Sequence, residues 1–174
     1  MEDYPTLIFM YGYPASGKST YSEKFIKEHS DFILLSADKI REEVYGSQDK
    51  YGDPYTMYLK ILYKMRKLLK ENKNVIYDAT NLKSQYRLDY LLNIQGIECY
   101  KKIVCLMEEK EVCIERHLNR KRNIAIEKLF PYFEINEFPV FSEGWDEIQV
   151  NSPSCKETIY FKKFKPQRKV IDLL

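Results

Sequence analysis

A run of nine residues near the amino terminus carries the strongest chemical signal in the chain. It reads G-Y-P-A-S-G-K-S-T and fits the pattern G-x-x-x-x-G-K-[ST], in which glycines let backbone N–H groups turn toward phosphate oxygens. A lysine amine at this spacing can reach the β- and γ-phosphates of a nucleotide, and the next hydroxyl can bind Mg²⁺. A simple turn with a solvent-exposed lysine is the alternative. We predict an ATP and Mg²⁺ site, with Ser19 as metal ligand, formed by Gly12, Tyr13, Pro14, Ala15, Ser16, Gly17, Lys18, Ser19 and Thr20.

A carboxylate and an arginine follow the next apolar run, Phe32 to Leu35. Asp38 comes three residues before Arg41, so the two share one face of a short helix predicted over 38–44. A carboxylate near an acceptor hydroxyl can take its proton during phosphoryl transfer, and a planar guanidinium can hold a phosphate. Asp38 could instead only cap its helix or hold Mg²⁺ through water. We expect Asp38 to act as the catalytic base and Arg41 to bind the acceptor.

A third polar group follows the apolar run Val75 to Tyr77. It contains Asp78, Thr80 and Asn81. The carboxylate of Asp78 could lie in the outer coordination shell of Mg²⁺, or it could cap the turn that follows, and the sequence leaves both readings open.

A basic segment lies further along the chain. Arg116, Arg120, Lys121 and Arg122 put four fixed positive charges into seven residues, more than helix stability alone explains. Such a segment can close over a triphosphate and stabilise negative charge that develops during transfer. A solvated basic face is the plainer reading. We expect a lid over about residues 114–126, with Arg116 and Arg120 on the donor phosphates and Arg120, like Lys18, in a catalytic role.

The elements that must position these groups alternate between strand and helix. Apolar runs at 7–11, 32–35, 75–77 and 103–107 predict buried strands, and weaker patterns at 147–151 and 158–161 are candidate short strands. Helical spacing predicts a helix that begins at Lys18, and further helices over about 38–44, 56–70, 84–94, 108–122 and 123–133, the last one bent at Pro131. Alternation of this kind predicts an α/β fold, a three-layer P-loop kinase-like sandwich with a mostly parallel sheet of about five strands and helices on both faces. The carboxyl ends of the strands should then bring all the chemical groups to one edge.

Size and composition restrict the function classes. A chain of 174 residues suits one domain, residues 1–174, and its net charge of +2 gives no global field for nucleic acid. Its four cysteines form no C-x-x-C pair and have two histidines as possible partners, so structural zinc is not expected. No stretch is long and apolar enough for a membrane span, and we expect a cytoplasmic protein without a membrane partner.

Taken together, these motifs resemble the kinase module of the bacteriophage-type polynucleotide 5′-hydroxyl kinases over about residues 6–135. The loop is similar to the family's G-x-P-x-S-G-K-S-T, Asp38-Lys-Ile-Arg41 to its D-x-x-R, Thr80-Asn81 to its T-N, and Arg116 to Arg120 to its R-x-x-x-R. The resemblance implies that Asp38 is the general base, that Arg41, Thr80 and Asn81 bind the acceptor phosphate, and that the two lid arginines contact the donor phosphates. No D-x-D-x-T pattern occurs, so the phosphatase module of some family members is not expected.

The activity implied is ATP-dependent phosphoryl transfer to the 5′-hydroxyl end of a DNA or RNA strand, as in nucleic-acid end repair. A small-molecule kinase acting on a nucleoside, a sugar or an amino-sugar nucleotide is the first alternative, and a non-catalytic nucleotide-binding protein is the second. Arg41 separates the first two readings, since a grip on a 3′-phosphate is useless to an acceptor that lacks one. The oligomeric state and the role of residues 136–174 are left open by the sequence.

Overall fold

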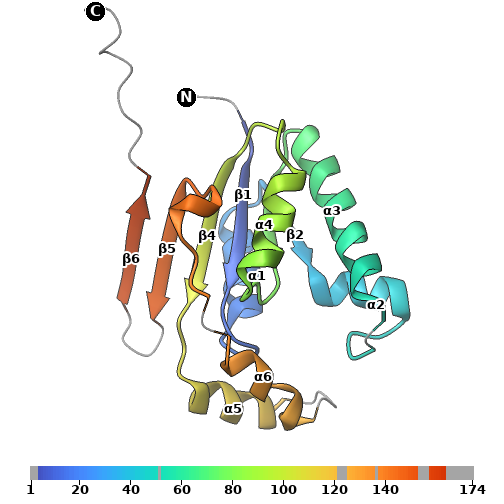
Figure 1. Cartoon of the computed structure of the whole chain (residues 1–174), viewed down its shortest axis with the longest axis vertical. Coiled ribbons are helices and arrows are strands. Elements are labelled where there is room, and N and C mark those ends of the chain that lie inside the picture. Colours follow the sequence, from blue (N-terminus) through green and yellow to red (C-terminus); the bar gives the residue numbers. More distant parts are fainter. Residues whose placement is uncertain (1–3, 51, 121–124, 136, 153–156, 164–174) are drawn as a thin grey trace, which may run out of the picture.

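A computed structural model describes residues 4–50, 52–120, 125–135, 137–152 and 157–163. Within these ranges the strands form one sheet of six, in the order β2-β3-β1-β4-β5-β6 (Figure 1). The strands are β1 (Thr6–Tyr11), β2 (Phe32–Ser36), β3 (Asn74–Asp78), β4 (Tyr100–Leu106), β5 (Glu147–Ser152) and β6 (Glu157–Lys162). The first five pair in parallel, and β6 pairs antiparallel with β5 at the edge. The predicted mostly parallel sheet is confirmed, with one strand more than expected because the short pattern near residue 160 does pair.

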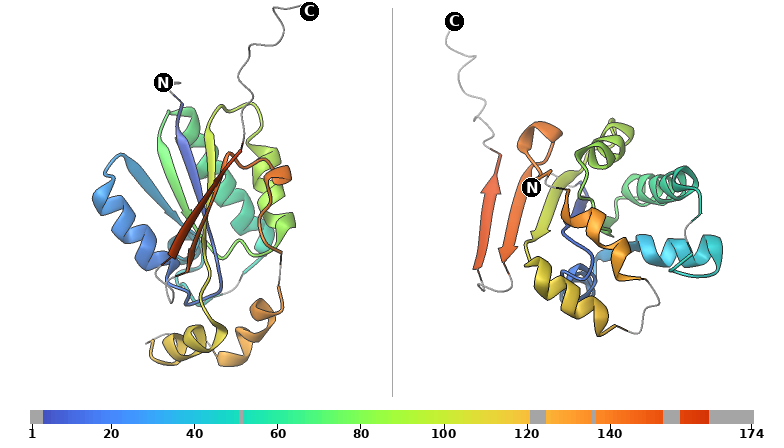
Figure 2. Two further views of the ribbon diagram at one scale, coloured as in Figure 1. Left: turned by 90° about the vertical axis from the view of Figure 1, so that its left-hand side faces the viewer. Right: turned by 60° about the horizontal axis from the view of Figure 1, so that its bottom comes forward.

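Helices cover both faces of this sheet, as predicted (Figure 2, left). In the described ranges they are α1 (Lys18–Glu28), α2 (Ala37–Tyr45), α3 (Pro54–Lys70), α4 (Ser84–Asn93), α5 (Lys110–Leu118) and α6 (Phe130–Phe133). Two 3₁₀ turns, η1 (Ile126–Lys128) and η2 (Phe141–Glu143), complete the connections.

Alternation along β1 explains the three layers. Leu7, Phe9 and Tyr11 point to a core that includes residues of α3 and α4, whereas Ile8 and Met10 pack in a second core with side chains of α1. Successive strand residues face opposite sides of a sheet, so an apolar run without polar interruptions needs cover on both faces. The central strands are accordingly buried almost completely.

Capping residues fix where α2 and α3 begin. Asp53 accepts hydrogen bonds from the backbone N–H groups of Tyr55 and Thr56, which starts α3 two residues earlier than predicted, with Pro54 in its first turn. Ser36, rather than Asp38, caps α2, and Gly46 ends it with φ of 77°. Asp38 is therefore not used as the helix cap.

The lid region departs most from the predicted helices. α5 spans Lys110–Leu118 rather than 108–122, and the described part of 123–133 forms η1 and α6 instead of one bent helix. Pro131 has no backbone N–H for an α-helical hydrogen bond and lies in the first turn of α6, where that loss is tolerated. The lid residues 121–124, which include Lys121 and Arg122, and the basic tail beyond Lys163 lie outside the described residues.

The strand ends and the lid meet at one edge. α5 and α6 lie beyond the carboxyl ends of the parallel strands, at the bottom of the molecule in Figure 1. Tyr13 of the glycine loop packs edge-on against Phe133 of α6, with ring centroids 5.0 Å apart, and contacts the small core formed by Cys113, Leu129 and Phe133. This contact holds the α5–α6 region against the loop that follows β1.

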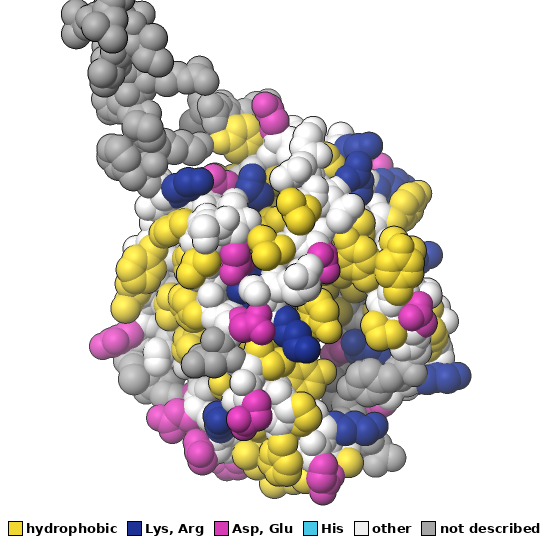
Figure 3. Space-filling model, viewed as in Figure 1, with side chains coloured by type: hydrophobic (Ala, Val, Ile, Leu, Met, Phe, Trp, Pro, Cys, Tyr) yellow, Lys and Arg dark blue, Asp and Glu magenta, His cyan; other side chains and the backbone are white. Residues whose placement is uncertain are grey.

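The surface shows no large region of one charge sign on the face in view (Figure 3), which agrees with the small net charge of the chain. Acidic and basic side chains are interspersed on the face shown in Figure 3. Among the described residues, no helix has the length and apolar character needed to cross a bilayer. Cys99, Cys105 and Cys113 are buried free thiols, and no cluster of three or more histidine, cysteine or acidic side chains suited to a metal occurs in the described ranges.

Candidate active site

The glycine loop between β1 and α1 has a backbone that requires glycine at two points. Gly12 has φ of 148°, and a Cβ there would lie 2.6 Å from the carbonyl oxygen of Leu106 on the neighbouring strand. Gly17 has φ of 101° and forms the N-cap of α1, so the loop opens directly onto a helix N-terminus. The Gly12 N–H donates to the Thr80 carbonyl over 3.1 Å, which ties this loop to the end of β3.

Lys18, the first residue of α1, is folded back into this loop. Its side chain is buried, and Nζ donates to the carbonyl oxygens of Gly12 at 3.0 Å and Tyr13 at 2.6 Å and to Ser16 Oγ at 3.4 Å. Burial lowers the pKa of Lys18 from 10.5 to about 8, against the opposing effect of the Asp78 carboxylate. A desolvated ammonium that touches mainly carbonyl dipoles gains most from an anion placed beside it.

Ser19 and Asp78 form a pair next to Lys18. Asp78 ends β3 and is buried, which raises its pKa, whereas a hydrogen bond with the Ser19 side chain and the charge of Lys18 act in the opposite direction. A serine hydroxyl and a carboxylate are hard oxygen donors, and Mg²⁺ is commonly held by one or two such groups together with substrate phosphates and water. The residues present therefore fit Mg²⁺ better than zinc.

Asp38 and Arg41 interact directly on α2. Arg41 Nη1 donates to Asp38 Oδ1 over 2.5 Å and to the Gln48 carbonyl oxygen over 3.2 Å, and both side chains are partly exposed. The guanidinium is thus oriented by a carboxylate on one side and a loop carbonyl on the other, and Arg41 lines the cavity described next.

One cavity of about 170 Å³ joins these groups, and we name it the transfer cavity. Lys18 and Ser19 line it from α1, Asp38 and Arg41 from α2, and Asp78 and Thr80 from the end of β3. The α5–α6 region forms a further wall with His117, Arg120, Lys128, Leu129 and Tyr132, and the remaining lining residues are Pro14, Ala15, Ala37 and Ala79. The residues selected from three separate strand ends therefore share one cavity, while their roles stay predictions.

Asn81 lies differently from its neighbour Thr80. Its side chain is buried with φ of 48°, and its amide Nδ2 donates to the Met10 carbonyl oxygen over 2.7 Å. It lines an adjoining cavity of about 310 Å³ rather than the transfer cavity. This hydrogen bond is structural, since it joins the β3–α4 connection to β1.

The arginines of α5 reach the glycine loop. Arg116 pairs with Glu108 at 2.9 Å and its Nη1 donates to the Ser16 carbonyl oxygen at 3.5 Å. Arg120, just beyond the helix, lines both the transfer cavity and an open cavity of about 570 Å³ over Gly17 and Thr20. Both arginines thus lie beside the glycine loop.

Sequence reasoning missed Arg87, which supports the β3–α4 connection beside the transfer cavity. It is fully buried in α4, forms a two-point ion pair with Glu143 at 2.8 and 2.6 Å, and donates to the carbonyl oxygens of Asn81 and Leu82. Trp145 Nε1 also donates to Glu143. The partner lies 56 residues away, so no local spacing could have identified the pair. Tyr132 was missed for the same reason, because α6 reaches the cavity only through the tertiary fold.

Comparisons with known proteins agree with this geometry. A family described as an AAA domain matches residues 7–130. The L-seryl-tRNA(Sec) kinase of Methanococcus maripaludis is 30% identical over 162 residues, covering 88% of this chain and 61% of that protein.

Solved structures share the fold. The Pnkp1/Rnl/Hen1 RNA repair complex contains a chain with a TM-score of 0.64 and 21% identity, covering 80% of this chain and 49% of that one. Kti12 of Chaetomium thermophilum in complex with ADP-AlF3 has a TM-score of 0.64 and 17% identity, covering 84% and 89%. This chain spans 61% of the length of the seryl-tRNA kinase and 49% of the chain from the RNA repair complex. The family match covers residues 7–130, well over half of this chain, and shows that the chain belongs to the AAA domain family of P-loop kinase-like proteins.

Proposed function

We propose that this protein transfers the γ-phosphoryl group of ATP to the 5′-hydroxyl end of a polynucleotide. The observation that carries the proposal is the transfer cavity, in which a donor-binding lysine, a carboxylate and an arginine on α2, and a lid arginine line one space. The kinase relatives named above support phosphoryl transfer as the reaction class. The paired Asp38 and Arg41 support an acceptor that carries a phosphate close to its reacting hydroxyl.

The donor side is built from the glycine loop and α1. The inward N–H groups of the loop and the start of α1 favour the β- and γ-phosphates, and the buried Lys18 ammonium exchanges carbonyl contacts for phosphate oxygens. The Tyr13 carbonyl oxygen accepts a hydrogen bond from Lys18, and the Tyr13 ring packs against Phe133 of α6. Both contacts stabilise the conformation of the glycine loop.

Ser19 and Asp78 are the residues that would hold Mg²⁺, the hydroxyl directly and the carboxylate in the outer shell through water. When bound there, the ion neutralises charge on the β- and γ-phosphate oxygens. The burial that raises the pKa of Asp78 has less effect once a cation lies beside it, so a charged carboxylate is stabilised in the loaded site.

The transfer step requires a base for the hydroxyl proton and residues that bind the strand to be phosphorylated. The 5′-oxygen forms a bond to the γ-phosphorus, the bond from that phosphorus to the β–γ bridging oxygen breaks, and ADP leaves with those electrons. The hydroxyl proton passes to Asp38, which the neighbouring Arg41 orients over 2.5 Å. Arg41 and Thr80 bind the phosphate on the 3′ side of the acceptor nucleoside. Arg120, and Arg116 above Ser16, stabilise charge on the donor phosphates as the bond breaks.

A second candidate acceptor is an aminoacyl-tRNA. The Methanococcus maripaludis relative, which matches 88% of this chain, is a kinase for L-seryl-tRNA(Sec), and it supports an acceptor in which the hydroxyl is attached to the end of a nucleic acid. The same cavity residues would serve either acceptor, since both need a base for the hydroxyl and a positive group for the flanking phosphate.

An acceptor panel tests the proposal. Transfer of ³²P from γ-labelled ATP is measured with 5′-hydroxyl RNA, 5′-hydroxyl DNA, a nucleoside 3′-monophosphate, the free nucleoside and a seryl-tRNA. We expect labelled polynucleotide, and a kcat/KM for the 3′-monophosphate at least tenfold above that for the free nucleoside, because a charged hydrogen bond to Arg41 contributes about 1.5–3 kcal/mol. Equal kcat/KM values for the nucleoside 3′-monophosphate and the free nucleoside would favour a small-molecule kinase. Labelling of seryl-tRNA alone would favour the second candidate, and tight ATP binding without any product would contradict both.

A further inference from the structure

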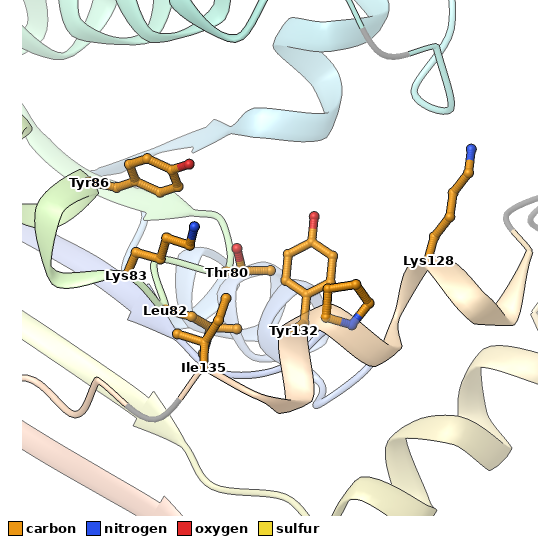
Figure 4. A pocket seen from close by; sticks show the side chains of 8 residues that line it. Thr80, Leu82, Lys83, Tyr86, Lys128, Tyr132 and Ile135 are labelled. Atoms are coloured by element: carbon orange, nitrogen blue, oxygen red, sulfur yellow. The ribbon is translucent and has the colours of Figure 1, made fainter.

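A large groove opens beside the transfer cavity, and none of the roles above uses it. It has a volume of about 620 Å³ and lies between the start of α4 and the η1–α6 segment (Figure 4). Thr80, Lys128 and Tyr132 line both spaces, so the groove continues directly from the transfer cavity. We name it the acceptor groove; its lining residues are Thr80, Leu82, Lys83, Tyr86, Lys128, Pro131, Tyr132 and Ile135.

The walls of the acceptor groove combine aromatic rings with positive charge. Tyr86 from α4 and Tyr132 from α6 lie on opposite sides of Thr80, with Leu82 and Ile135 at the base between them (Figure 4). Tyr86 is 56% exposed, so its ring is accessible to a ligand. Lys83 Nζ lies 5.7 Å from the Tyr86 ring centroid, and the exposed Lys128 stands beyond Tyr132. No acidic residue is among the described side chains that line the groove.

These features select a ligand that is flat, aromatic and anionic. Planar rings stack on tyrosine, and phosphate oxygens pair with lysine, so a nucleotide can use both surfaces at once, whereas a neutral sugar offers no anion to the lysines. The volume lies within the roughly 300–1,000 Å³ usual for sites that bind small ligands, and is ample for one nucleotide. Continuity with Thr80 and Arg41 places that nucleotide next to the one that carries the reacting hydroxyl.

We infer that the acceptor groove binds the second nucleotide of an unpaired acceptor strand, with its base on Tyr86 and its phosphate near Lys83 and Lys128. This inference rests on the proposed function and narrows its substrate to single-stranded 5′ ends at least two nucleotides long. A base in a duplex is already stacked and paired, and it would have to leave the helix before it could contact Tyr86. A blunt duplex end is therefore the poorer acceptor.

Acceptors of increasing length provide the test. The kcat/KM is measured for a nucleoside 3′-monophosphate, a dinucleotide 3′-phosphate, a single-stranded octamer and the same octamer in a blunt duplex, with RNA and DNA versions of each. For the parent protein we expect a rise of at least fivefold from the mononucleotide to the dinucleotide, and a blunt duplex at least fivefold below the single strand.

Variants then assign the effect to the groove. Tyr86→Ala and Lys83→Ala should lower the ratio of octamer to mononucleotide kcat/KM by about fivefold or more, because stacking on one aromatic ring is sequence-tolerant and strong. Tyr63→Ala, an equally exposed tyrosine on α3 outside all of these cavities, is the matched control and should leave the ratio unchanged. An unchanged ratio in Tyr86→Ala, or equal use of single strand and blunt duplex, would overturn the inference.

Binding separates failure of this inference from failure of the proposed function. Fluorescence anisotropy of a 3′-labelled 5′-hydroxyl octamer measures affinity without transfer. Binding that weakens at least fivefold in Tyr86→Ala would support the groove even if the oligonucleotide is not phosphorylated. No octamer binding up to high micromolar protein would refute the groove, whatever acceptor the enzyme uses.

Discussion

Two buried cations in this protein have opposite surroundings. Arg87 lies under the β3–α4 connection, where the Glu143 carboxylate neutralises it at two points and two backbone carbonyls accept its remaining hydrogen bonds. Lys18 lies in the glycine loop, where its hydrogen-bond partners are carbonyl and hydroxyl oxygens and burial lowers its pKa to about 8. A buried charge that is fully paired serves the fold, and one left without a close counter-ion is suited to bind an anion.

Removal of Lys18 should separate activity from stability most sharply. In Lys18→Met we expect kcat/KM to fall about a thousandfold or more, because the γ-phosphate loses its nearest positive charge in a dry site. The melting temperature should stay level or rise, since an unfavourably buried ammonium has been replaced by a side chain of similar length. Phosphate-transfer assays and thermal melts of the same preparation measure both, and a clear loss of stability would contradict the contrast with Arg87.

Removal of Arg87 should do the reverse. Arg87→Met leaves Glu143 buried without its cation, and we expect the free energy of unfolding to fall by about 3–5 kcal/mol in urea denaturation. The double variant Arg87→Met with Glu143→Met should recover at least half of this loss, because no lone charge remains. Lys60→Met at an exposed position of α3 is the surface control, with a change below about 1 kcal/mol. If the double variant is as unstable as the single one, packing rather than charge pairing explains the role of Arg87.

The pH dependence of nucleotide binding should sharpen the contrast further. The folded pKa of Lys18 is depressed from its ordinary 10.5 to about 8, so free protein loses the ammonium as pH rises through 8. Bound phosphate favours the charged form, and ATP affinity should therefore fall about tenfold between pH 7 and pH 9, with proton uptake on binding above pH 8. Isothermal calorimetry in buffers of different ionisation enthalpy measures both quantities. Lys18→Met should bind ATP weakly, with an affinity that does not change with pH. A parent protein whose ATP affinity is equally independent of pH would refute the lowered pKa of Lys18.

The same shift acts on stability with a defined sign. Because the folded pKa lies below the unfolded one, the charged form is disfavoured by folding, and the contribution of Lys18 to stability increases between about pH 8 and pH 10.5. This increase should be absent from Lys18→Met when the two proteins are compared by denaturation across that range.

Groups defined by short spacing could be predicted from the sequence. Gly12 and Gly17 lie where the loop needs a left-handed or crowded backbone, and Asp38 and Arg41 meet because three residues separate them on one helix. The alternation of apolar runs with helical segments was sufficient to predict the layered parallel sheet, because buried parallel strands have few other solutions.

Features that depend on distant parts of the chain could not be predicted. The Arg87–Glu143 pair joins two segments that only the fold brings together, and the Asn81 amide bonds to the Met10 carbonyl rather than to the transfer cavity. The acceptor groove combines α4 with α6, where a charged and proline-containing sequence gave poor helix boundaries. Propensity does not specify which faces of such short elements point into a common space.

The central claim is that Asp38 takes the proton of an acceptor hydroxyl held opposite the γ-phosphate, and single-turnover transfer by Asp38→Asn tests it most directly. With ATP prebound and a 5′-hydroxyl oligonucleotide in excess, we expect the chemical rate to fall about a hundredfold or more while ATP affinity changes less than threefold. Glu42→Gln, an exposed acidic residue on the same helix, is the matched control and should keep the parent rate. A rate for Asp38→Asn within tenfold of the parent would contradict the account.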